Sequence, residues 1–328
     1  MKIEAVIFGR GKEPHHIHKA WLNSIGIKKF HNFTIFDFRK IHPSLGALNQ
    51  ITGFMKSLFI PKADVYILTG IGALPAVILN KILHDSKIIT INSDTFFTDY
   101  NKSTGFKRKY MTWLISYLDG MISSSNWVKN ISPLDIPSKV VYPYCDYKRF
   151  SKVKPNYKSN NVICVGTGIN TKGTDIAINE FSNYTKKGSL FICGHIKPIK
   201  SLKIPKRVYL LGRIKPEPTM GDSSIFLNAS RHEAFGVNIL EGMSAGLPTI
   251  VTENCGAKEL VDKRLVVKEK DIGKKILELQ SNKALRIKLG KKSKILAKAY
   301  SKKKSLDYFK KAVKDILDIE RLEEYYEL

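Results

Sequence analysis

The stretch ASRHEAFGVNILEGMSAGLPTIVTENCGAKELV, residues 229–261, contains the pattern that decides the fold. A buried strand is predicted to end at Ser230, and a tight segment through Gly236 leads into a helix that begins near Val237. That helix is expected to end at Gly246-Leu247-Pro248, where another buried strand follows. A strand, a glycine-containing turn, a helix and a further strand are typical of a parallel sheet covered by helices.

The start of this helix is a predicted binding site for an anion. Gly236 lets the backbone approach a ligand closely, and the amides of Gly236, Val237 and Asn238 are exposed where the helix dipole favours negative charge. Glu233 lies just before these amides and Glu241 roughly one turn into the helix. Because a carboxylate can accept hydrogen bonds from a vicinal diol, the two carboxylates suit a ligand with hydroxyl groups as well as phosphate. A nucleoside diphosphate sugar has both.

Short apolar runs alternate with amphipathic segments on both sides of this stretch. A first series of strands is predicted at 2–9, 33–38, 65–70, 87–94, 119–125 and 139–143. A second series is predicted at 162–168, 189–194, 207–212, 223–230 and 248–253. Strand–helix alternation predicts two parallel sheets with helices on both faces, joined by the polar segment 142–161 and followed by basic amphipathic helices from Asp271 onward.

The chain resembles the retaining glycosyltransferases of family four, which have the GT-B fold. Glu233 and Glu241 match the E-x7-E signature of that family, and Gly242 stands where the family has alanine. The neighbouring residues that are also in register with the signature are Phe235, Gly236, Met243, Gly246 and Pro248.

The resemblance implies an α/β protein of two Rossmann-like domains that face each other across a cleft. The expected divisions are an acceptor-side domain at residues 1–145, a nucleotide-sugar domain at residues 146–302, and a C-terminal helix at residues 303–328 that packs back on the first domain.

The segment 162–181 resembles the donor-binding stretch of the family. Lys172 matches the lysine that the family places on the donor diphosphate, whereas the arginine that precedes it in the family falls on Thr167. Arg213 and Arg231 are the candidates to replace that arginine. The resemblance implies that the donor contacts the following residues: Gly166, Thr167, Lys172, Arg213, Ile214, Glu233, Phe235, Gly236, Val237, Asn238 and Glu241.

Three residues are expected to be catalytic: Lys172, Glu233 and Asp94. Asp94 ends a strand of the first half at a point where the family often has a His or Asp facing the reacting sugar, although a structural capping role explains it equally well. Gly9, Gly11 and His16 are expected to form a loop that contacts the acceptor or a phosphate.

The resemblance implies transfer of a sugar, a hexose or a related one, from a nucleotide-sugar donor to a hydroxyl or phosphate acceptor, with retention of configuration. No metal ion or other cofactor is expected, because Lys172 can neutralise the leaving diphosphate and the sequence has no D-x-D triplet. Two alternatives remain: a basic GT-B protein that binds or glycosylates nucleic acid, and a non-catalytic family member that acts as a partner subunit.

The charge of the chain is strongly positive. The 328 residues include 55 Lys and Arg against 29 Asp and Glu, and residues 263–314 alone hold 19 against 4. Such a surface is either solvated, or attracted to an anionic membrane, or, least favoured, bound to nucleic acid. Together with the cluster at residues 107–109, it suggests a lipid-linked or glycan acceptor at a membrane surface.

Several features indicate a cytoplasmic protein, peripheral on the cytoplasmic face of a membrane. The longest uncharged stretch, residues 65–80, is shorter than the roughly 20 residues that span a bilayer. No secretory signal is visible, and four scattered cysteines suit a reducing compartment. The apolar stretch at residues 48–60 is either a core helix or a helix that lies on a membrane.

Overall fold

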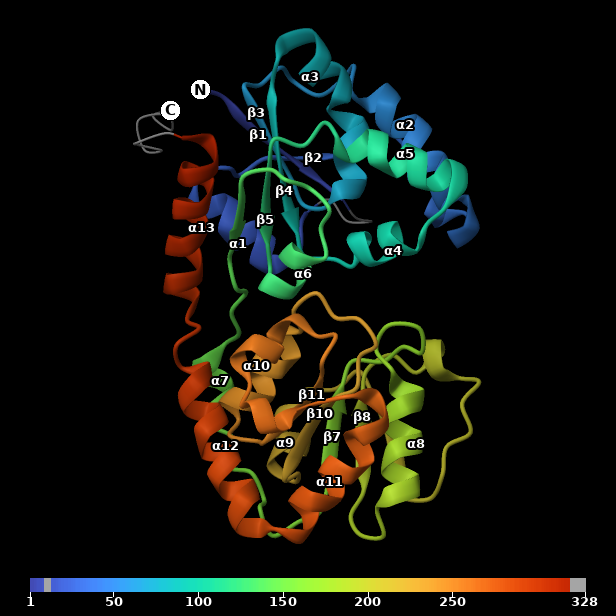
Figure 1. Ribbon diagram of the computed structural model, residues 1–328, viewed down its shortest axis with the longest axis vertical. Coiled ribbons are helices and arrows are strands. Elements are labelled where there is room, and N and C mark those ends of the chain that lie inside the picture. Colours follow the sequence, from blue (N-terminus) through green and yellow to red (C-terminus); the bar gives the residue numbers. More distant parts are fainter. Residues whose placement is uncertain (9–12, 319–328) are drawn as a thin grey trace. The chain divides into compact units, whose positions relative to one another are not determined.

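The computed structural model describes residues 1–8 and 13–318 and divides the chain into two compact units (Figure 1). Unit 1 consists of Met1–Tyr142 together with Lys303–Leu328, and unit 2 consists of Pro143–Lys302. The first boundary, expected at residue 145, therefore falls at Tyr142. Within the described part, no helix is long and apolar enough to cross a membrane.

Unit 1 is built on a six-stranded parallel sheet with the order β2-β1-β3-β4-β5-β6. Its strands are β1 (Ile3–Ile7), β2 (Phe30–Asn32), β3 (Val65–Leu68), β4 (Lys87–Asn92), β5 (Gly120–Ser123) and β6 (Ser138–Val140). Its helices are α1 (His16–Ser24), α2 (Leu48–Lys56), α3 (Ile78–His84), α4 (Phe96–Lys102), α5 (Gly105–Ile115), α6 (Asn126–Asn130) and α13 (Lys302–Leu317), with 3-10 turns η1 (Phe38–Lys40), η2 (Pro43–Ala47) and η3 (Ile71–Ala76). The inner strands are near-continuous apolar runs because helices cover both faces of the sheet.

The C-terminal helix α13 packs on unit 1, beside α1 (Figure 1). The indole of Trp21 stacks on the ring of Phe309, with centroids 5.4 Å apart, and its Nε1 donates to Ser305 Oγ at 2.9 Å. Gly120 on β5 makes room for this helix, because a Cβ there would lie 2.3 Å from Ile316. The last helix of the chain therefore completes the core of the first unit.

One predicted strand of unit 1, at residues 33–38, is wrong. The strand of this region is the shorter β2, which ends at Asn32, and the residues after it turn instead of pairing. Side-chain hydrogen bonds replace the ladder: Thr34 Oγ1 donates to the Phe36 carbonyl at 2.7 Å, and Asp37 accepts from the Arg39 amide at 3.1 Å. Such local bonds compete with strand formation, which an apolar sequence alone does not reveal.

Unit 2 is built on a second six-stranded parallel sheet, with the order β12-β11-β10-β7-β8-β9. Its strands are β7 (Val162–Val165), β8 (Leu190–Cys193), β9 (Val208–Gly212), β10 (Ile225–Asn228), β11 (Thr249–Thr252) and β12 (Val266–Val267). Its helices are α7 (Tyr147–Phe150), α8 (Thr174–Tyr184), α9 (Glu217–Gly221), α10 (Val237–Ser244), α11 (Ile272–Ser281) and α12 (Lys283–Ala297), with 3-10 turns η4 (Lys197–Ile199), η5 (Gly256–Leu260), η6 (Lys263–Leu265) and η7 (Glu269–Asp271). Helices α8 and α11 pack together, as do α10 and α12 (Figure 1).

The strand order of unit 2 places a ligand site at one point of its sheet. The chain moves outward from β7 through β8 to β9 and then returns to add β10, β11 and β12 on the other side of β7. Connections that leave β7 and β10 therefore diverge, and ligands of doubly wound sheets bind in the crevice that opens at the carboxyl ends of such neighbouring strands.

Candidate functional site

Lys172 lies at this crevice, in the connection from β7 to α8. The next residue, Gly173, has φ +58°, and a Cβ there would lie 2.0 Å from the carbonyl oxygen of Ala229, the residue that follows β10. Only glycine allows the loop to approach the end of β10 so closely. The loop is also tied back to β7, because the amide of Gly168 donates to Thr174 Oγ1 at 3.0 Å. Lys172 is thus held where the two connections meet.

Glu233, in the connection from β10 to α10, forms an ion pair with Lys172. The Lys172 Nζ donates to Glu233 Oε2, and the side chains are 34% and 14% exposed, so the ammonium remains accessible to a ligand. The backbone of Glu233 is fixed on both sides, since its amide donates to the Asn254 carbonyl at 3.1 Å and its carbonyl accepts from the Gly256 amide at 2.8 Å. A cation and a carboxylate from connections that follow different strands are therefore brought together.

Helix α10 begins at Val237, as predicted, after Gly236 with φ +91°. No described residue accepts a hydrogen bond from the backbone N–H groups of Gly236, Val237 and Asn238. The side-chain amide of Asn238 donates to the Val165 carbonyl at the end of β7, which fixes the helix start against the neighbouring strand. Backbone donors that have no partner among the described residues, at a fixed helix start, can bind a phosphate.

Phe235, an expected donor contact, has a buried side chain, and its contact with a donor stays a prediction. Its side chain is only 3% exposed, and its carbonyl accepts from the Ala257 amide at 3.0 Å. The ring is buried in the core, where it anchors the turn that carries Glu233 and Gly236. A hydrophobic residue in a ligand-binding motif can be there for packing, and sequence alone does not separate the two roles.

Glu241 is half-buried on α10, and its carboxylate accepts no hydrogen bond from the part of the chain that the structure describes. Burial, the largest cause, raises its pKa to about 7; the nearby Arg149 lowers the pKa and Glu217 raises it. Arg149 does not pair with Glu241, because its Nε donates to Glu217, and this hydrogen bond holds the pKa of Glu217 below its usual value. Glu241 is therefore a carboxyl group with unused acceptors.

The Arg149–Glu217 pair beside Glu241 was missed by the sequence reasoning. It joins α7 to α9, which are far apart in the chain, and no local motif announces it. Cys145, one turn before Arg149, also contacts α10 through a 3.3 Å hydrogen bond with Ser244 Oγ.

Arg231, one candidate for the missing second cation, is already paired with a carboxylate. Both guanidinium nitrogens of Arg231 donate to the Asp175 carboxylate, at 2.8 and 2.6 Å, and they hold the pKa of Asp175 below its usual value. Thr167, in the arginine position, donates through Oγ1 to the His195 carbonyl at 2.6 Å. Arg213 and Ile214 are both exposed just after β9, and no ion pair of Arg213 exists among the described residues. Arg213 is the remaining candidate.

Gly166 closes β7 on the other side of Lys172. Its amide donates to the Cys193 carbonyl at 2.7 Å, and its φ of +94° requires glycine. Most of the donor-contact residues expected from the sequence thus lie at the carboxyl ends of β7, β9 and β10 of a single unit.

In unit 1, Asp94 follows β4 and has a structural partner. Its Oδ1 accepts from the Phe96 amide at 2.9 Å, while its Oδ2 lies 3.5 Å from the position that a Cβ of Gly70 would take, at the end of β3. Burial raises the pKa of Asp94. One oxygen therefore serves the turn, and the expected catalytic role stays a prediction.

His16 is exposed at the first position of α1, and Gly9 and Gly11 lie outside the described residues. The neighbouring His18 has partners on both sides: its Nε2 lies 2.8 Å from Ser93 Oγ, and its ring stacks on Trp21. Burial lowers the pKa of His18 to about 3, so the ring is neutral. In the described part of the chain, no three His, Cys, Asp or Glu side chains gather in a way that could hold a metal ion.

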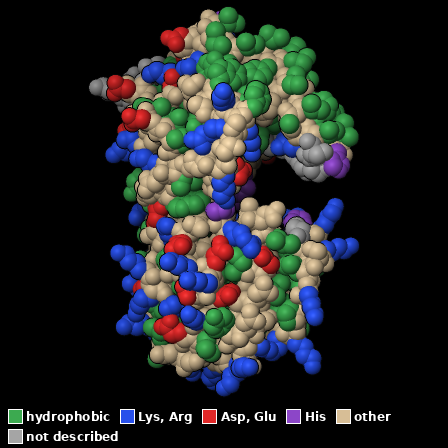
Figure 2. Space-filling view, turned by 45° about the vertical axis from the view of Figure 1, so that its right-hand side comes forward, with side chains coloured by type: hydrophobic (Ala, Val, Ile, Leu, Met, Phe, Trp, Pro, Cys, Tyr) green, Lys and Arg blue, Asp and Glu red, His purple; other side chains and the backbone are tan. Residues whose placement is uncertain are grey.

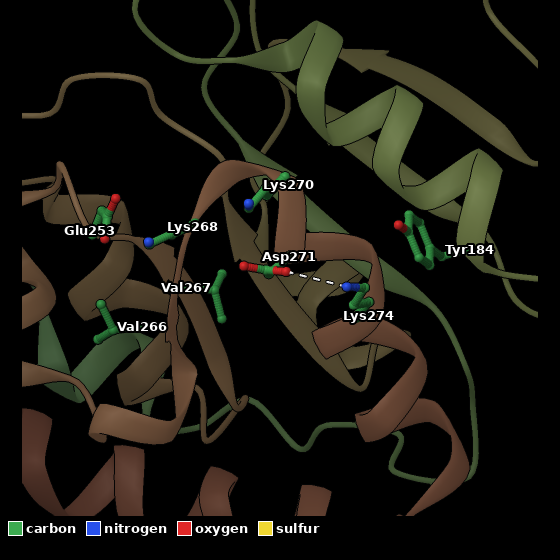
Figure 3. Close-up of a pocket in the computed structure, with 8 residues that line it drawn as sticks. All are labelled: Tyr184, Glu253, Val266, Val267, Lys268, Lys270, Asp271 and Lys274. Atoms are coloured by element: carbon green, nitrogen blue, oxygen red, sulfur yellow. Dashed lines mark ion pairs between the residues drawn. The ribbon is translucent and has the colours of Figure 1, made fainter.

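A separate pocket of about 710 Å³ lies at the edge strand β12 of unit 2 (Figure 3). It is lined by Tyr184, Glu253, Val266, Val267, Lys268, Lys270, Asp271 and Lys274. Figure 3 shows Lys274 paired with Asp271, whose atoms are 3.6 Å apart. None of the candidate catalytic or donor-contact residues lines this pocket.

Gly242 is explained by packing inside α10. A Cβ at this position would lie 2.5 Å from Cγ of Phe226, a fully buried ring on β10. We expect Gly242→Ala to lower the free energy of unfolding by about 1–3 kcal/mol, because the ring must be displaced in a close-packed core. Denaturant titration of the full chain, followed by circular dichroism, measures the change.

The matched test of this explanation is the double variant Phe226→Leu/Gly242→Ala. If the Phe226 ring causes the strain, the double variant is more stable than the sum of the two single changes predicts. Additive losses, or an unaltered Gly242→Ala protein, would show that the ring does not limit the space.

Comparison with known proteins now gives the class of this architecture. A crystal structure of HepE from Anabaena in complex with UDP-glucose superposes with a TM-score of 0.72 over 97% of this chain and 100% of that chain, at 14% identity. The two Rossmann-like units thus form the GT-B fold, as expected. Residues 159–282, which contain Lys172, Glu233 and Glu241, match the family described as Glycosyl transferases group 1.

Two curated relatives agree with this assignment. An uncharacterized glycosyltransferase of Methanocaldococcus jannaschii is 26% identical over 261 residues, which cover 75% of this chain and 73% of that protein. The GPI3 subunit of the phosphatidylinositol N-acetylglucosaminyltransferase of Saccharomyces cerevisiae is 25% identical over 238 residues, 63% of this chain and 52% of that protein. Domain match and fold together support a glycosyltransferase.

Proposed function

We propose that the protein is a retaining glycosyltransferase that uses a nucleotide sugar as donor. The observation that carries the proposal is the group at the carboxyl ends of β7 and β10: the accessible Lys172–Glu233 pair, the free amides at the start of α10, and the unpaired Glu241. These offer a cation and amides for a diphosphate, and carboxylates for sugar and ribose hydroxyl groups. The HepE neighbour binds UDP-glucose, which is a ligand of this kind.

In the proposed reaction, the bond between the anomeric carbon and the diphosphate oxygen breaks, and the acceptor oxygen bonds to the same face of the sugar. The departing phosphate oxygen takes the proton of an acceptor hydroxyl. Lys172 and the amides of Gly236 and Val237 stabilise the negative charge that develops on the diphosphate, and Glu233 orients the sugar hydroxyl groups. Asp94 is the proposed residue of unit 1 that faces the reacting sugar.

The proposed acceptor is a lipid-linked or glycan hydroxyl or phosphate at the cytoplasmic face of a membrane. The yeast relative is named for transfer to phosphatidylinositol, a membrane lipid. The 19 Lys and Arg against 4 Asp and Glu in residues 263–314 give the surface an attraction for anionic lipids. Nucleic acid is the less favoured partner for the same basic surface.

The test is a thermal-shift panel of nucleotide sugars, including UDP-glucose, UDP-N-acetylglucosamine and GDP-mannose, followed by a transfer assay with the best one. A donor at 100 times its dissociation constant stabilises the folded protein by about 2.7 kcal/mol. Transfer in the presence of EDTA should equal transfer without it, because Lys172 and not a metal neutralises the diphosphate. No stabilisation by any nucleotide sugar would contradict the proposal.

A second candidate function is that of a non-catalytic subunit. Thr167 in place of the family arginine, with Arg231 engaged by Asp175, leaves one cation fewer at the diphosphate position. The yeast relative is itself a subunit. Donor binding without donor hydrolysis or transfer by the isolated chain would favour this second function.

A further inference from the structure

Helix α2 of unit 1 has its large apolar side chains on the outside. Ile51 and Met55, one turn apart on α2, are 60% and 52% exposed, and Leu58 and Phe59, in the turn that follows the helix, are 72% and 67% exposed. A helix of a water-soluble protein has the opposite arrangement, with its apolar stripe facing the core.

The buried side of the same helix is small and polar. Asn49, Gly53 and Ser57 face the interior. Asn49 is held by the Phe38 amide at 2.9 Å and by Asp37 at 2.8 Å, and a Cβ on Gly53 would lie 3.1 Å from Pro75. Hydrogen bonds and close backbone approach thus fix α2 to the unit, so its exposed apolar side chains are not needed to attach it.

Two neighbouring helices extend this surface. Tyr110 Oη on α5 donates to Gln50 of α2 at 3.1 Å, and Trp113 packs on Phe54 with ring centroids 5.8 Å apart. On α3, Asn80 donates to the Ser57 carbonyl at 3.0 Å. Both α3 and α5 also carry exposed apolar side chains: Ile82 is 59%, Leu83 70% and Phe106 84% exposed.

We define the apolar face of unit 1 by these side chains: Ile51, Met55, Leu58, Phe59, Ile82, Leu83 and Phe106. Figure 2 shows hydrophobic side chains gathered over this unit. Of the 20 large hydrophobic side chains exposed in the described part of the chain, 12 lie between residues 35 and 113. Single exposed apolar residues need no explanation, but a contiguous patch marks an interaction surface.

The charges around the apolar face identify its occupant. Segments 38–63 and 100–118, which contain α2 and α5, hold eight Lys and Arg and no Asp or Glu. Lys62, Lys107 and Lys109 among them are exposed. A bilayer surface combines an apolar interior with a layer of phosphates above it, and Tyr and Trp side chains favour the boundary between the two.

We propose that unit 1 docks on an anionic lipid bilayer by inserting the apolar face, with α2 lying in the interface. The proposal rests on the proposed function, a glycosyltransferase that works at a membrane. The membrane contact is then made by insertion of the apolar face, and not by the basic surface of residues 263–314. Insertion adds a hydrophobic component that salt does not screen, whereas attraction by lysines alone decays within about 3 Å at 1 M salt.

The experiment is co-sedimentation of the full chain with vesicles of phosphatidylcholine and phosphatidylglycerol, at low and at high salt. Each Leu or Phe removed from a lipid interior weakens partitioning by about tenfold, so Leu58→Gln/Phe59→Gln should lower vesicle binding by about ten- to a hundredfold. The matched control is Ile295→Gln on α12 of unit 2, a side chain that is 73% exposed and should leave binding unchanged. Quenching of Trp113 by brominated lipid, lost in Trp113→Phe, reports the insertion itself.

Several outcomes overturn the inference. Vesicle binding that high salt abolishes and Leu58→Gln/Phe59→Gln does not alter would assign docking to lysines alone. Absence of vesicle binding at low salt would exclude a lipid occupant. If the wild-type chain is then a dimer in solution and Leu58→Gln/Phe59→Gln is a monomer, the apolar face is covered by a second copy of the chain instead. Stabilisation by the donor is measured on the same variants and should be unaltered, so a failure of membrane docking is distinguished from a failure of the glycosyltransferase proposal.

Discussion

Replacing Lys172 by alanine is expected to lower the rate of sugar transfer by about a hundredfold to a thousandfold. The ammonium lies at the carboxyl end of β7, paired with Glu233 and still 34% exposed. In the proposed reaction it meets the charge that develops on the leaving diphosphate, so its loss affects the transition state more than the ground state. The expected sign is a fall in kcat that exceeds any rise in the KM of the acceptor.

The effect should be large because the site has little reserve of positive charge. Arg231 donates twice to Asp175, and the arginine position of the family holds Thr167. Lys172→Arg keeps the charge and should retain part of the rate, although a guanidinium does not reproduce a compact ammonium. Lys186→Ala, which removes an exposed lysine of the same unit, is the matched control and should not alter transfer.

Normal turnover of Lys172→Ala would move the role to Arg213, the exposed cation after β9, and Arg213→Ala would then show the loss instead. The melting temperature of Lys172→Ala must be measured in parallel, because the change leaves the carboxylate of Glu233, which is 14% exposed, without its partner. Glu233→Gln/Lys172→Ala removes that unpaired charge, so its melting temperature shows how much of any stability loss comes from the uncompensated carboxylate.

The architecture of unit 2 could be predicted because its signals are local. Gly236 and the apolar runs on either side of α10 define a turn, a helix and a strand within one stretch of chain. The ends of β7 and β10 then come together through the rules of parallel sheets, which bring Lys172 and Glu233 into contact from 61 residues apart. A motif whose residues are close in sequence is enough to define this crevice.

Features that depend on distant partners could not be predicted. Glu217 and Asp175 are ordinary surface carboxylates in the sequence, and only the fold shows that Arg149 and Arg231 engage them. The burial of Phe235 is of the same kind, since the motif marks the residue but not the direction of its ring.

The stretch at residues 48–60 shows a further limit of pattern reading. Its apolar spacing fits a core helix and a membrane-lying helix equally, because both have one apolar face. What separates them is which face the rest of the unit covers, and that is decided by Asn49 and Ser57, whose hydrogen bonds turn the polar side inward. The periodicity of the sequence predicts that the helix has an apolar face, but only the tertiary structure shows whether that face points to the core or to the outside.

Glu241→Gln is expected to weaken donor binding by about ten- to a hundredfold and to remove its dependence on pH near neutrality. The change removes a charged acceptor from one or two hydrogen bonds with the ribose, each worth about 1.5–3 kcal/mol when the acceptor is ionised. In the free protein, burial raises the pKa of Glu241 to about 7. Wild-type affinity should therefore increase from pH 6 to pH 8 as the carboxyl group ionises, and calorimetric titration with a nucleotide sugar measures it.

The same shift predicts an opposite effect on stability. A carboxyl group whose pKa rises from 4.5 in the unfolded chain to about 7 in the fold prefers its neutral form there. The associated stability is complete below pH 4.5 and is lost as the pH rises through 7, about 3 kcal/mol in all. Without donor, Glu241→Gln should thus be more stable than wild type at pH 8 and about as stable at pH 4. The control is Glu253→Gln, which replaces an exposed carboxylate of the same unit. If Glu241→Gln binds the donor as tightly as wild type at every pH, the ribose assignment is refuted. The neutral amide of glutamine cannot ionise, so it cannot reproduce the pH-dependent hydrogen bonds that a Glu241 carboxylate would make.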